Sequence, residues 1–194
     1  MKIPFFSTRN YDKEIFIARN QDHPHSIEFF EPELNEKYVI LAKGYDAVCI
    51  FVNDVLDEKV IVELASYKVK AILLRCTGYN NVDLHAAKAN NIAVMRVSHY
   101  SPYAVAEYAM TLIMALNRKV YKSYNRIKRG NFELTGLMGF DLFNKTVGVV
   151  GTGKIGQVFT AILKGFGCRI IAYDLYPNKQ CIADGVTYVT LDQL

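Results

Sequence analysis

The feature that most constrains the fold is a β-rich run that leads directly into a glycine-rich turn and then into a helical pattern. The run is Lys145–Val150, the turn is Gly151–Gly156, and apolar residues follow at helical spacing at Val158, Ile162, Leu163 and Phe166. A second β-rich run, Arg169–Tyr173, ends at Asp174. This order of elements predicts a βαβ unit of a parallel sheet, with the sharp turn at the carboxyl end of its first strand.

Each part of this unit has a separate physical task in binding a dinucleotide. Gly151 permits the tight turn, Gly153 lets the backbone approach a pyrophosphate, and Gly156 lets helix and strand pack closely. The helix N-terminus adds N–H donors and a positive dipole. Asp174 is placed to accept from the adenosine ribose, and it would repel a 2′-phosphate that Leu175–Asn178 offers no arginine to neutralise. We therefore expect NAD rather than NADP, the alternative being a glycine-rich turn with no ligand.

The first hundred residues alternate short apolar runs with helical patterns, which is typical of a parallel sheet covered on both faces. The expected strands are Lys2–Ser7, Ile27–Phe30, Ala47–Phe51, Ala71–Cys76 and Ala93–Val97. The expected helices are Asp12–Asn20, Glu33–Lys43, Asp57–Ser66 and Val82–Ala89. The pattern predicts an α/β fold in which a flavodoxin-like domain, residues 1–99, precedes an incomplete Rossmann domain, residues 100–194.

A loop, Arg75–Asp83, leaves the fourth expected strand and ends at a helix start. In open α/β sheets ligands bind beyond the carboxyl ends of the strands. Free backbone N–H groups on such a loop would suit a carboxylate. An ordinary strand-to-helix turn is the alternative.

An unusually long helical pattern runs from Tyr103 to Arg129, after Pro102, and a glycine-containing loop, Leu134–Phe143, follows it. The first half of the helix is apolar on nearly every side, so it must be covered by a second domain or a partner subunit, which favours a dimer. Its second half is basic and includes Arg118, Lys119, Lys122, Arg126, Lys128 and Arg129. A solvated face is the simpler interpretation of that charge.

Composition excludes several classes of protein. The longest apolar stretch, Ala104–Leu116, is too short to span a bilayer, and the N-terminus has no apolar segment typical of a secretory signal, so we expect a cytoplasmic protein without a membrane partner. Four cysteines form no CxxC pair, which favours reduced thiols and no metal site. A net charge of +4 is weak support for any partner, and we expect no nucleic acid.

Three segments together resemble the D-isomer-specific 2-hydroxy acid dehydrogenases: Arg75–Asp83, Tyr100–Glu107 and Gly151–Gly156. The resemblance covers essentially the whole chain and is greatest to the bacterial fermentative members that reduce pyruvate to D-lactate. It implies a two-domain subunit, an α/β domain supplying part of the substrate pocket, a Rossmann domain holding NAD, and a homodimer or higher homo-oligomer.

The resemblance also assigns residues. It implies that the backbone N–H groups of Cys76, Thr77 and Gly78 hold the substrate carboxylate and that Tyr100 lines the pocket. Lys154 and Ile155 match the positions that meet the pyrophosphate, beside Gly151, Gly153 and Gly156, and Asp174 matches the ribose acid. The family's catalytic arginine, histidine and glutamate lie farther along the chain than this sequence reaches, so no catalytic residue is assigned in it.

That expectation also has support from the residues. Only 44 residues follow from Gly151 onward, whereas each further βα unit takes about 30, so we expect the first two Rossmann strands and a third at Val186–Val189. An edge of the strand at Val147–Val150 would then expose apolar surface. The four histidines, His23, His25, His85 and His99, lack a carboxylate at a spacing that suggests acid–base work.

These observations favour the N-terminal part of an NAD-dependent dehydrogenase that acts on a small 2-keto acid, pyruvate, and that has little or no turnover by itself. Two alternatives stay open. One is a relative acting on glycerate, phosphoglycerate or a bulkier acid, although Tyr79 and Tyr100 near the expected pocket favour a small substrate. The other is a non-catalytic module that senses NAD, whose basic segment 118–129 could contact nucleic acid.

Overall fold

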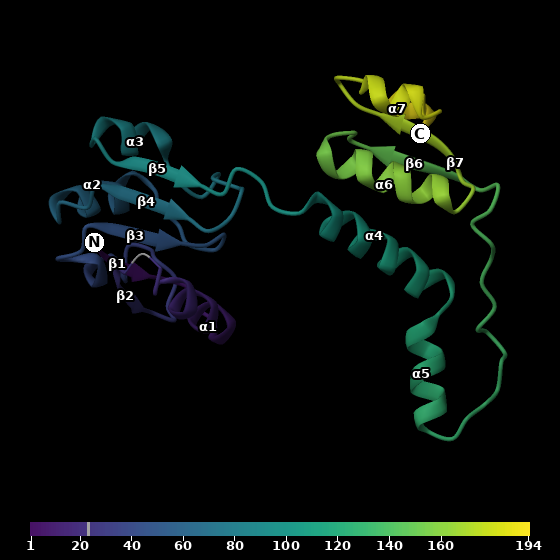
Figure 1. Cartoon of the computed structure of the whole chain (residues 1–194), viewed down its shortest axis with the longest axis horizontal. Helices are drawn as coiled ribbons and strands as arrows, with labels where there is room; N and C mark the ends of the chain where they lie inside the picture. Colours follow the sequence, from purple (N-terminus) through teal and green to yellow (C-terminus); the bar gives the residue numbers. More distant parts are fainter. Residues whose placement is uncertain (23) are drawn as a thin grey trace. The chain divides into compact units, whose positions relative to one another are not determined.

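Five parallel strands form a sheet in the order β2-β1-β3-β4-β5 in the computed structural model, which describes residues 1–22 and 24–194 (Figure 1). The strands are β1 (Lys2–Phe5), β2 (Ser26–Phe29), β3 (Ala47–Ile50), β4 (Ala71–Leu74) and β5 (Ala93–Arg96). Four of them lie within runs expected to be strands, β2 begins one residue before its expected run, and the order is that of flavodoxin-type sheets. The expected α/β class with a parallel sheet is therefore confirmed. The chain divides into two compact units, Met1–Tyr100 and Ser101–Leu194.

Successive side chains of a strand point to opposite faces of the sheet, and in this sheet both sets of side chains are mainly apolar, which explains why both faces are covered. In β3, Val48 and Ile50 pack in one core with helices α2 (Glu58–Ser66) and α3 (Leu84–Ala89). Ala47 and Cys49 point to the opposite face, where a separate core includes Phe16 of α1 (Asn10–Arg19). All four residues of β3 are buried, as expected for a central strand of a parallel sheet.

The helix expected over Glu33–Lys43 is wrong, because only a short 3-10 turn, η1 (Val39–Ala42), forms there. The Asn35 side chain takes two backbone donors that an α-helix over these residues would need, and Asp54 holds the backbone at Leu34 from outside the segment. The Asn35 side chain accepts from the N–H groups of Lys37 and Tyr38, and the Leu34 N–H donates to Asp54 Oδ1 at 2.6 Å. Such local and long-range acceptors compete with helix formation.

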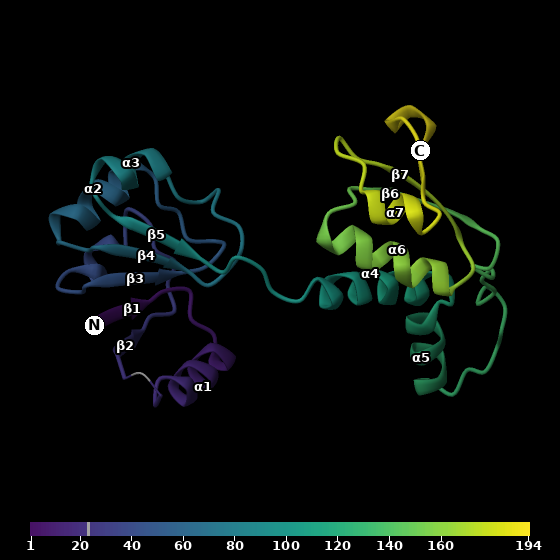
Figure 2. The same ribbon diagram turned by 45° about the horizontal axis from the view of Figure 1, so that its top comes forward.

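The second unit contains a three-stranded parallel sheet in the order β6-β7-β8. Its strands are β6 (Thr146–Val150), β7 (Arg169–Tyr173) and β8 (Thr187–Tyr188), connected by α6 (Lys154–Gly165) and α7 (Lys179–Ala183), with a 3-10 turn η2 (Leu191–Gln193) after β8. The third expected strand is thus present, and β6 lies at one edge of the sheet with Val150 67% exposed. Helices α4 (Pro102–Asn117) and α6 lie side by side (Figure 2).

The single helix expected from Tyr103 to Arg129 is wrong, because the chain breaks it into α4 and α5 (Val120–Lys128). Lys119 between them has a left-handed backbone, with φ of 52°. The Asn117 side chain donates to the Phe140 carbonyl at 2.7 Å and accepts from the Phe140 N–H at 2.9 Å. These contacts fix the end of α4 against a loop that follows α5. Within the residues described, no helix is both long and apolar enough to cross a membrane.

Much of the basic charge at the end of α4 and in α5 is used inside the chain. Arg126 Nη1 donates to the carbonyls of Glu133 and Thr135 at 2.7 and 2.8 Å, and Lys119 Nζ donates to the Gly136 carbonyl at 3.1 Å. Arg118 pairs with Asp141 at 3.8 Å. These basic side chains therefore hold the segment 131–141 alongside α5.

Candidate functional site

The glycine-rich turn in the second unit has the geometry that its spacing predicts. Gly151 has φ of +91°, a conformation that residues with a Cβ rarely adopt. A Cβ on Gly156 would lie 2.1 Å from the Gly151 carbonyl oxygen, so only glycine fits where α6 meets the turn. A Cβ on Gly153 would meet nothing within 4 Å. The space beside Gly153 is open, which is what close approach of a ligand to this backbone requires.

Helix α6 begins at this turn with its first donors uncapped. Gly153 is the residue before the helix and provides no side-chain acceptor for the N–H groups of the first turn. Such N–H groups, together with the helix dipole, favour an anion. Lys154 and Ile155 occupy the first turn and are exposed. A cleft of about 510 Å³ lies here, lined by the turn, the start of α6 and two small residues of α4, Ala106 and Ala109.

Asp174, at the end of β7, is held by three donors. Its Oδ2 accepts from the N–H and the hydroxyl of Thr152 at 2.6 and 3.0 Å, and its Oδ1 accepts from the Tyr176 N–H at 2.9 Å. These hydrogen bonds, that from Tyr176 foremost, lower the pKa of the Asp174 carboxyl below its ordinary value. Since a carboxylate can accept about four hydrogen bonds, a site on Oδ1 stays open for a hydroxyl.

In the first unit, the loop after β4 turns its carbonyl groups toward protein donors. The Cys76 carbonyl accepts from the Val97 N–H at 3.1 Å, the Thr77 carbonyl from Arg96 Nη1 at 2.6 Å, and the Gly78 carbonyl from the Cys76 thiol at 3.3 Å. The N–H groups of Thr77 and Gly78 donate to no acceptor in the part of the chain that the structure describes. Two consecutive free backbone donors on one loop are groups from which a carboxylate can accept hydrogen bonds.

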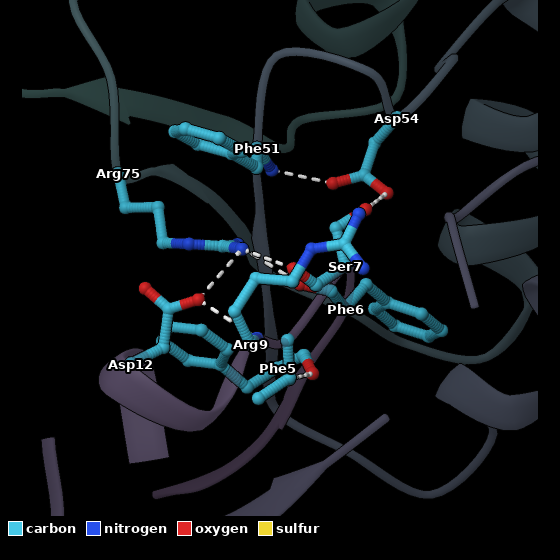
Figure 3. A network of polar contacts seen from close by, with 9 residues as sticks. Phe5, Phe6, Ser7, Arg9, Asp12, Phe51, Asp54 and Arg75 are labelled. Carbon is cyan, nitrogen blue, oxygen red and sulfur yellow. Dashed lines mark hydrogen bonds and ion pairs between the residues drawn. The ribbon is translucent and has the colours of Figure 1, made fainter. Parts of the chain in front are cut away.

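A buried arginine fixes the start of this loop (Figure 3). Arg75 donates to the carbonyls of Phe6 and Ser7 at 2.9 and 2.7 Å, and its Nη2 lies 3.6 Å from Asp12 Oδ2. The Arg75 and Asp12 side chains are only 8% and 11% exposed. The guanidinium also lies between two aromatic rings, 4.4 Å from the Phe5 centroid and 4.6 Å from the Phe51 centroid. Arg75 thereby links the carboxyl ends of β1, β3 and β4.

Burial shifts the pKa of several acidic groups near this arginine. Burial is the main cause that raises the pKa of the Asp54 carboxyl, although hydrogen bonds from Phe51, Leu34 and Ser7 oppose it. Burial raises the pKa of Cys49 to about 12 and also raises that of Cys76, and Arg75 opposes both shifts. Cys76 is therefore a protonated thiol at neutral pH, consistent with its donation to the Gly78 carbonyl.

The structure gives less support to a site role for Tyr100, the histidines and possible metal ligands. Tyr100 is the last residue of the first unit and is 58% exposed. His99 Nδ1 lies 3.1 Å from Ser98 Oγ, and among the described residues no histidine forms an ion pair with a carboxylate. His23 lies outside the described residues. The described residues also assemble no group of three or more possible metal ligands.

Three functional candidates were not found from the sequence: Thr152, Tyr188 and Arg96. Thr152 stands at a variable position of the glycine motif, yet it holds Asp174 and accepts from the Tyr188 hydroxyl at 2.7 Å. Arg96 fixes the carboxylate loop from β5. No local pattern marks these residues, because their partners lie 19 to 36 positions away.

The chain is similar to known dehydrogenases over nearly its whole length. Residues 3–192 match a family model described as D-isomer specific 2-hydroxyacid dehydrogenase, catalytic domain. The chain is 47% identical over 190 residues to 2-hydroxyacid dehydrogenase homolog 1 of Schizosaccharomyces pombe, covering 97% of this chain and 57% of that protein. It is 47% identical over 194 residues to D-lactate dehydrogenase of Escherichia coli, covering all of this chain and 59% of that protein.

Solved structures of D-lactate dehydrogenases are also similar to this chain. The apo-structure of the Escherichia coli D-lactate dehydrogenase superposes with a TM-score of 0.92 over the whole chain and 62% of the other. D-lactate dehydrogenase of Aquifex aeolicus, solved in complex with NAD and lactic acid, superposes with a TM-score of 0.83 at 25% identity, covering 99% of this chain and 57% of the other. The chain thus spans less than two thirds of the length of these relatives.

Proposed function

Because the chain belongs to the D-isomer specific 2-hydroxyacid dehydrogenase family, we propose that its second unit binds NAD and that the whole protein reduces pyruvate to D-lactate. The observation that carries this proposal is the open space beside Gly153, at the uncapped start of α6 and within the same unit as Asp174. In this proposal the pyrophosphate lies against the backbone of Gly153, Lys154 and Ile155, where N–H donors and the helix dipole favour its charge.

NAD is favoured over NADP because Asp174 is an ionised carboxylate with one acceptor site left. A ribose hydroxyl can donate to that site, whereas a 2′-phosphate would place like charges side by side. Leu175, Tyr176 and Pro177, which follow Asp174, provide no cation to offset the repulsion. Relatives solved with NAD, including that of Lactobacillus jensenii, support this choice.

The substrate in this proposal is a small 2-keto acid whose carboxylate binds the free N–H groups of Thr77 and Gly78, with Cys76 holding the loop and Tyr100 lining the pocket. Bound NADH would supply a hydride, that is two electrons and one hydrogen, for the keto carbon of the substrate, and the carbonyl oxygen would take its proton from a separate acid. The role of the loop is to bind and orient the carboxylate, and donors already held in place do so at low entropic cost. We assign no proton donor to the residues of this chain.

Calorimetry tests the cofactor half of the proposal on the 194-residue chain. We expect NADH to bind and NADPH to bind at least about tenfold more weakly, because the phosphate meets the Asp174 carboxylate. The Asp174→Ser variant removes that repulsion, so its affinities for NADH and NADPH should differ less than those of the unaltered chain. Equal affinity for the two coenzymes in the unaltered chain would contradict the role given to Asp174.

The substrate half of the proposal must be tested on a protein of the same length as the relatives. With NADH, such a protein should consume pyruvate faster than hydroxypyruvate, and chiral chromatography should identify D-lactate as the product. A preference for hydroxypyruvate would favour a glycerate-type dehydrogenase, the second candidate. NADH binding without turnover of any 2-keto acid would favour a non-catalytic NAD-sensing module.

We also propose that the protein is a homo-oligomer held together through its second unit. The face of α4 that is turned away from α6 exposes Tyr108, Leu112 and Leu116, and the segment after α5 exposes Phe132, Leu134, Met138 and Phe140, each by 46 to 86%. So many large apolar side chains within one segment are unusual for a surface in contact with water. A second copy of the chain supplies a matching apolar surface by symmetry.

Sedimentation velocity tests this assembly. The unaltered chain should sediment as a dimer or larger species at micromolar concentration, and Leu116→Glu should shift it toward monomer because a charge would be buried in the interface. Ile40→Glu is the matched control, since Ile40 is 54% exposed and belongs to the first unit, which contributes no residue to the proposed interface. Monomeric behaviour of the unaltered chain would contradict the proposal.

A further inference from the structure

The third strand of the second unit is connected to Asp174 by a chain of hydrogen bonds. The Tyr188 hydroxyl, on β8, lies 2.7 Å from Thr152 Oγ1, and Thr152 Oγ1 lies 3.0 Å from Asp174 Oδ2. At the other end, the Asn178 N–H donates to the Tyr188 hydroxyl at 2.9 Å. Asn178 precedes α7, so the chain of hydrogen bonds joins the glycine-rich turn, the end of β7, the start of α7 and β8.

The direction of every hydrogen bond in this series is determined by its two ends. An ionised carboxylate can only accept and a backbone N–H can only donate. The Thr152 hydroxyl must therefore give its one proton to Asp174 and accept from Tyr188. Tyr188 in turn gives its proton to Thr152 and accepts from Asn178. Donors aligned in one direction polarise one another, so the hydrogen bond that reaches the carboxylate is strengthened.

Three further features hold this series of hydrogen bonds in one geometry. Thr152 is 2% exposed, so water cannot readily replace a partner that its hydroxyl loses. The position of Tyr188 is set by pairing with β7, where Tyr188 lies opposite Ala172, two residues before Asp174. The Asn178 side chain also accepts from the N–H groups of Gln180 and Cys181 and so fixes the segment that supplies the last donor.

We propose that Tyr188 is a positioning residue for the coenzyme: acting through Thr152, it orients the Asp174 carboxylate so that its free acceptor site faces the ribose. This inference rests on the proposed function, because it takes Asp174 as the ribose acid. Tyr188 itself touches no coenzyme in this proposal. It keeps Asp174 Oδ2 occupied by Thr152, which leaves Oδ1 as the oxygen that accepts from the ligand.

The first readout needs no coenzyme. The pKa of Asp174, followed by carboxyl carbon NMR of the 194-residue chain, should rise in Tyr188→Phe and rise further in Thr152→Val, because the carboxylate loses hydrogen-bond support. Thr152→Ser keeps the hydroxyl and should restore the original titration. Tyr121→Phe is the matched control, since Tyr121 is 50% exposed on α5 of the same unit and is not part of the proposed interface.

The second readout is the dissociation constant for NADH, measured by calorimetry. Tyr188→Phe should weaken binding about three- to tenfold, the range for one lost hydrogen bond, while Tyr121→Phe leaves it unchanged. An unchanged Asp174 pKa in Tyr188→Phe overturns the inference. If the unaltered chain binds no NADH, the proposed function fails, and the Asp174 titration still decides whether Tyr188 acts on that carboxylate. Thermal unfolding of each variant distinguishes these effects from loss of the fold.

Discussion

Gly156→Ala should abolish NADH binding and lower the stability of the second unit. The new Cβ would lie 2.1 Å from the Gly151 carbonyl oxygen and 3.0 Å from its carbonyl carbon, both backbone atoms that cannot rotate away. The start of α6 must then move from the turn, and with it the N–H donors proposed to hold the pyrophosphate. We expect a loss of about 1–3 kcal/mol in unfolding free energy, as for other overpacked sites. Coenzyme affinity should fall by about a hundredfold or more.

Substitutions at Gly153, the residue before α6, and at Gly165, its last residue, distinguish an effect on stability from an effect on NADH binding. Gly153→Ala places its Cβ in open space, so the variant should fold normally but bind NADH poorly, because the methyl group occupies the place proposed for the pyrophosphate. Gly165→Ala also meets nothing within 4 Å, and it lies at the other end of α6. This control should bind NADH normally and gain about 0.5–1 kcal/mol, since alanine favours the helix.

Calorimetry with NADH and chemical unfolding followed by circular dichroism measure both effects. The combination of results is what identifies the turn as the coenzyme site. Normal NADH binding by Gly153→Ala would show that the coenzyme does not approach this backbone. Unchanged stability of Gly156→Ala would show that α6 and the turn can separate without cost, contrary to the contact seen here.

Arg75→Met should lower the unfolding free energy of the first unit by about 3–5 kcal/mol, the cost of breaking a buried ion pair by removing one partner. The substitution leaves the Asp12 carboxylate, 11% exposed, without its cation. It also leaves the Phe6 and Ser7 carbonyl groups without their donors. The aromatic contacts with Phe5 and Phe51 would lose their cation as well. Several partners are therefore lost with one side chain.

Lys59→Met is the matched control. The Lys59–Glu36 pair is shorter, at 3.0 Å against 3.6 Å, yet its side chains are 77% and 56% exposed. Water already solvates both charges, so we expect no measurable change in stability. Because the chain contains no tryptophan, urea unfolding is best followed by circular dichroism and tyrosine fluorescence. Equal losses for the two variants would mean that burial does not determine the strength of these pairs.

A double substitution refines the result for Arg75. If the loss comes mainly from the uncompensated Asp12 charge, Arg75→Met combined with Asp12→Leu should be more stable than Arg75→Met alone. If it comes mainly from the Phe6 and Ser7 carbonyl groups, the double variant should recover little. In either case the loop that begins at Cys76 should become more mobile, because Arg75 fixes its first residue to β1.

The sequence predicted those parts of the fold that depend on neighbouring residues. Short apolar runs located the strands, and the glycine spacing located the turn at Gly151–Gly156 with its positive φ at Gly151. Where a side chain distant in sequence intervened, local patterns failed. The Asp54 side chain holds the Leu34 N–H in the segment Glu33–Lys43, where no α-helix forms. Phe140 binds the Asn117 side chain at the point where the helix expected over Tyr103–Arg129 breaks.

The same division applies to the candidate site. By itself, the sequence determined the type of fold, the glycine-rich turn and the place of Asp174 at the end of a strand. Backbone conformation and hydrophobic periodicity are encoded within a few residues, so a local pattern is enough to predict these features. Only the tertiary structure decided how those groups are held. Arg75 reaches Ser7 across 68 positions and Tyr188 reaches Thr152 across 36, and such contacts exist only after the sheets have formed and brought the strand ends together. Hydrogen bonds of that kind depend on distance in space, which no local pattern records.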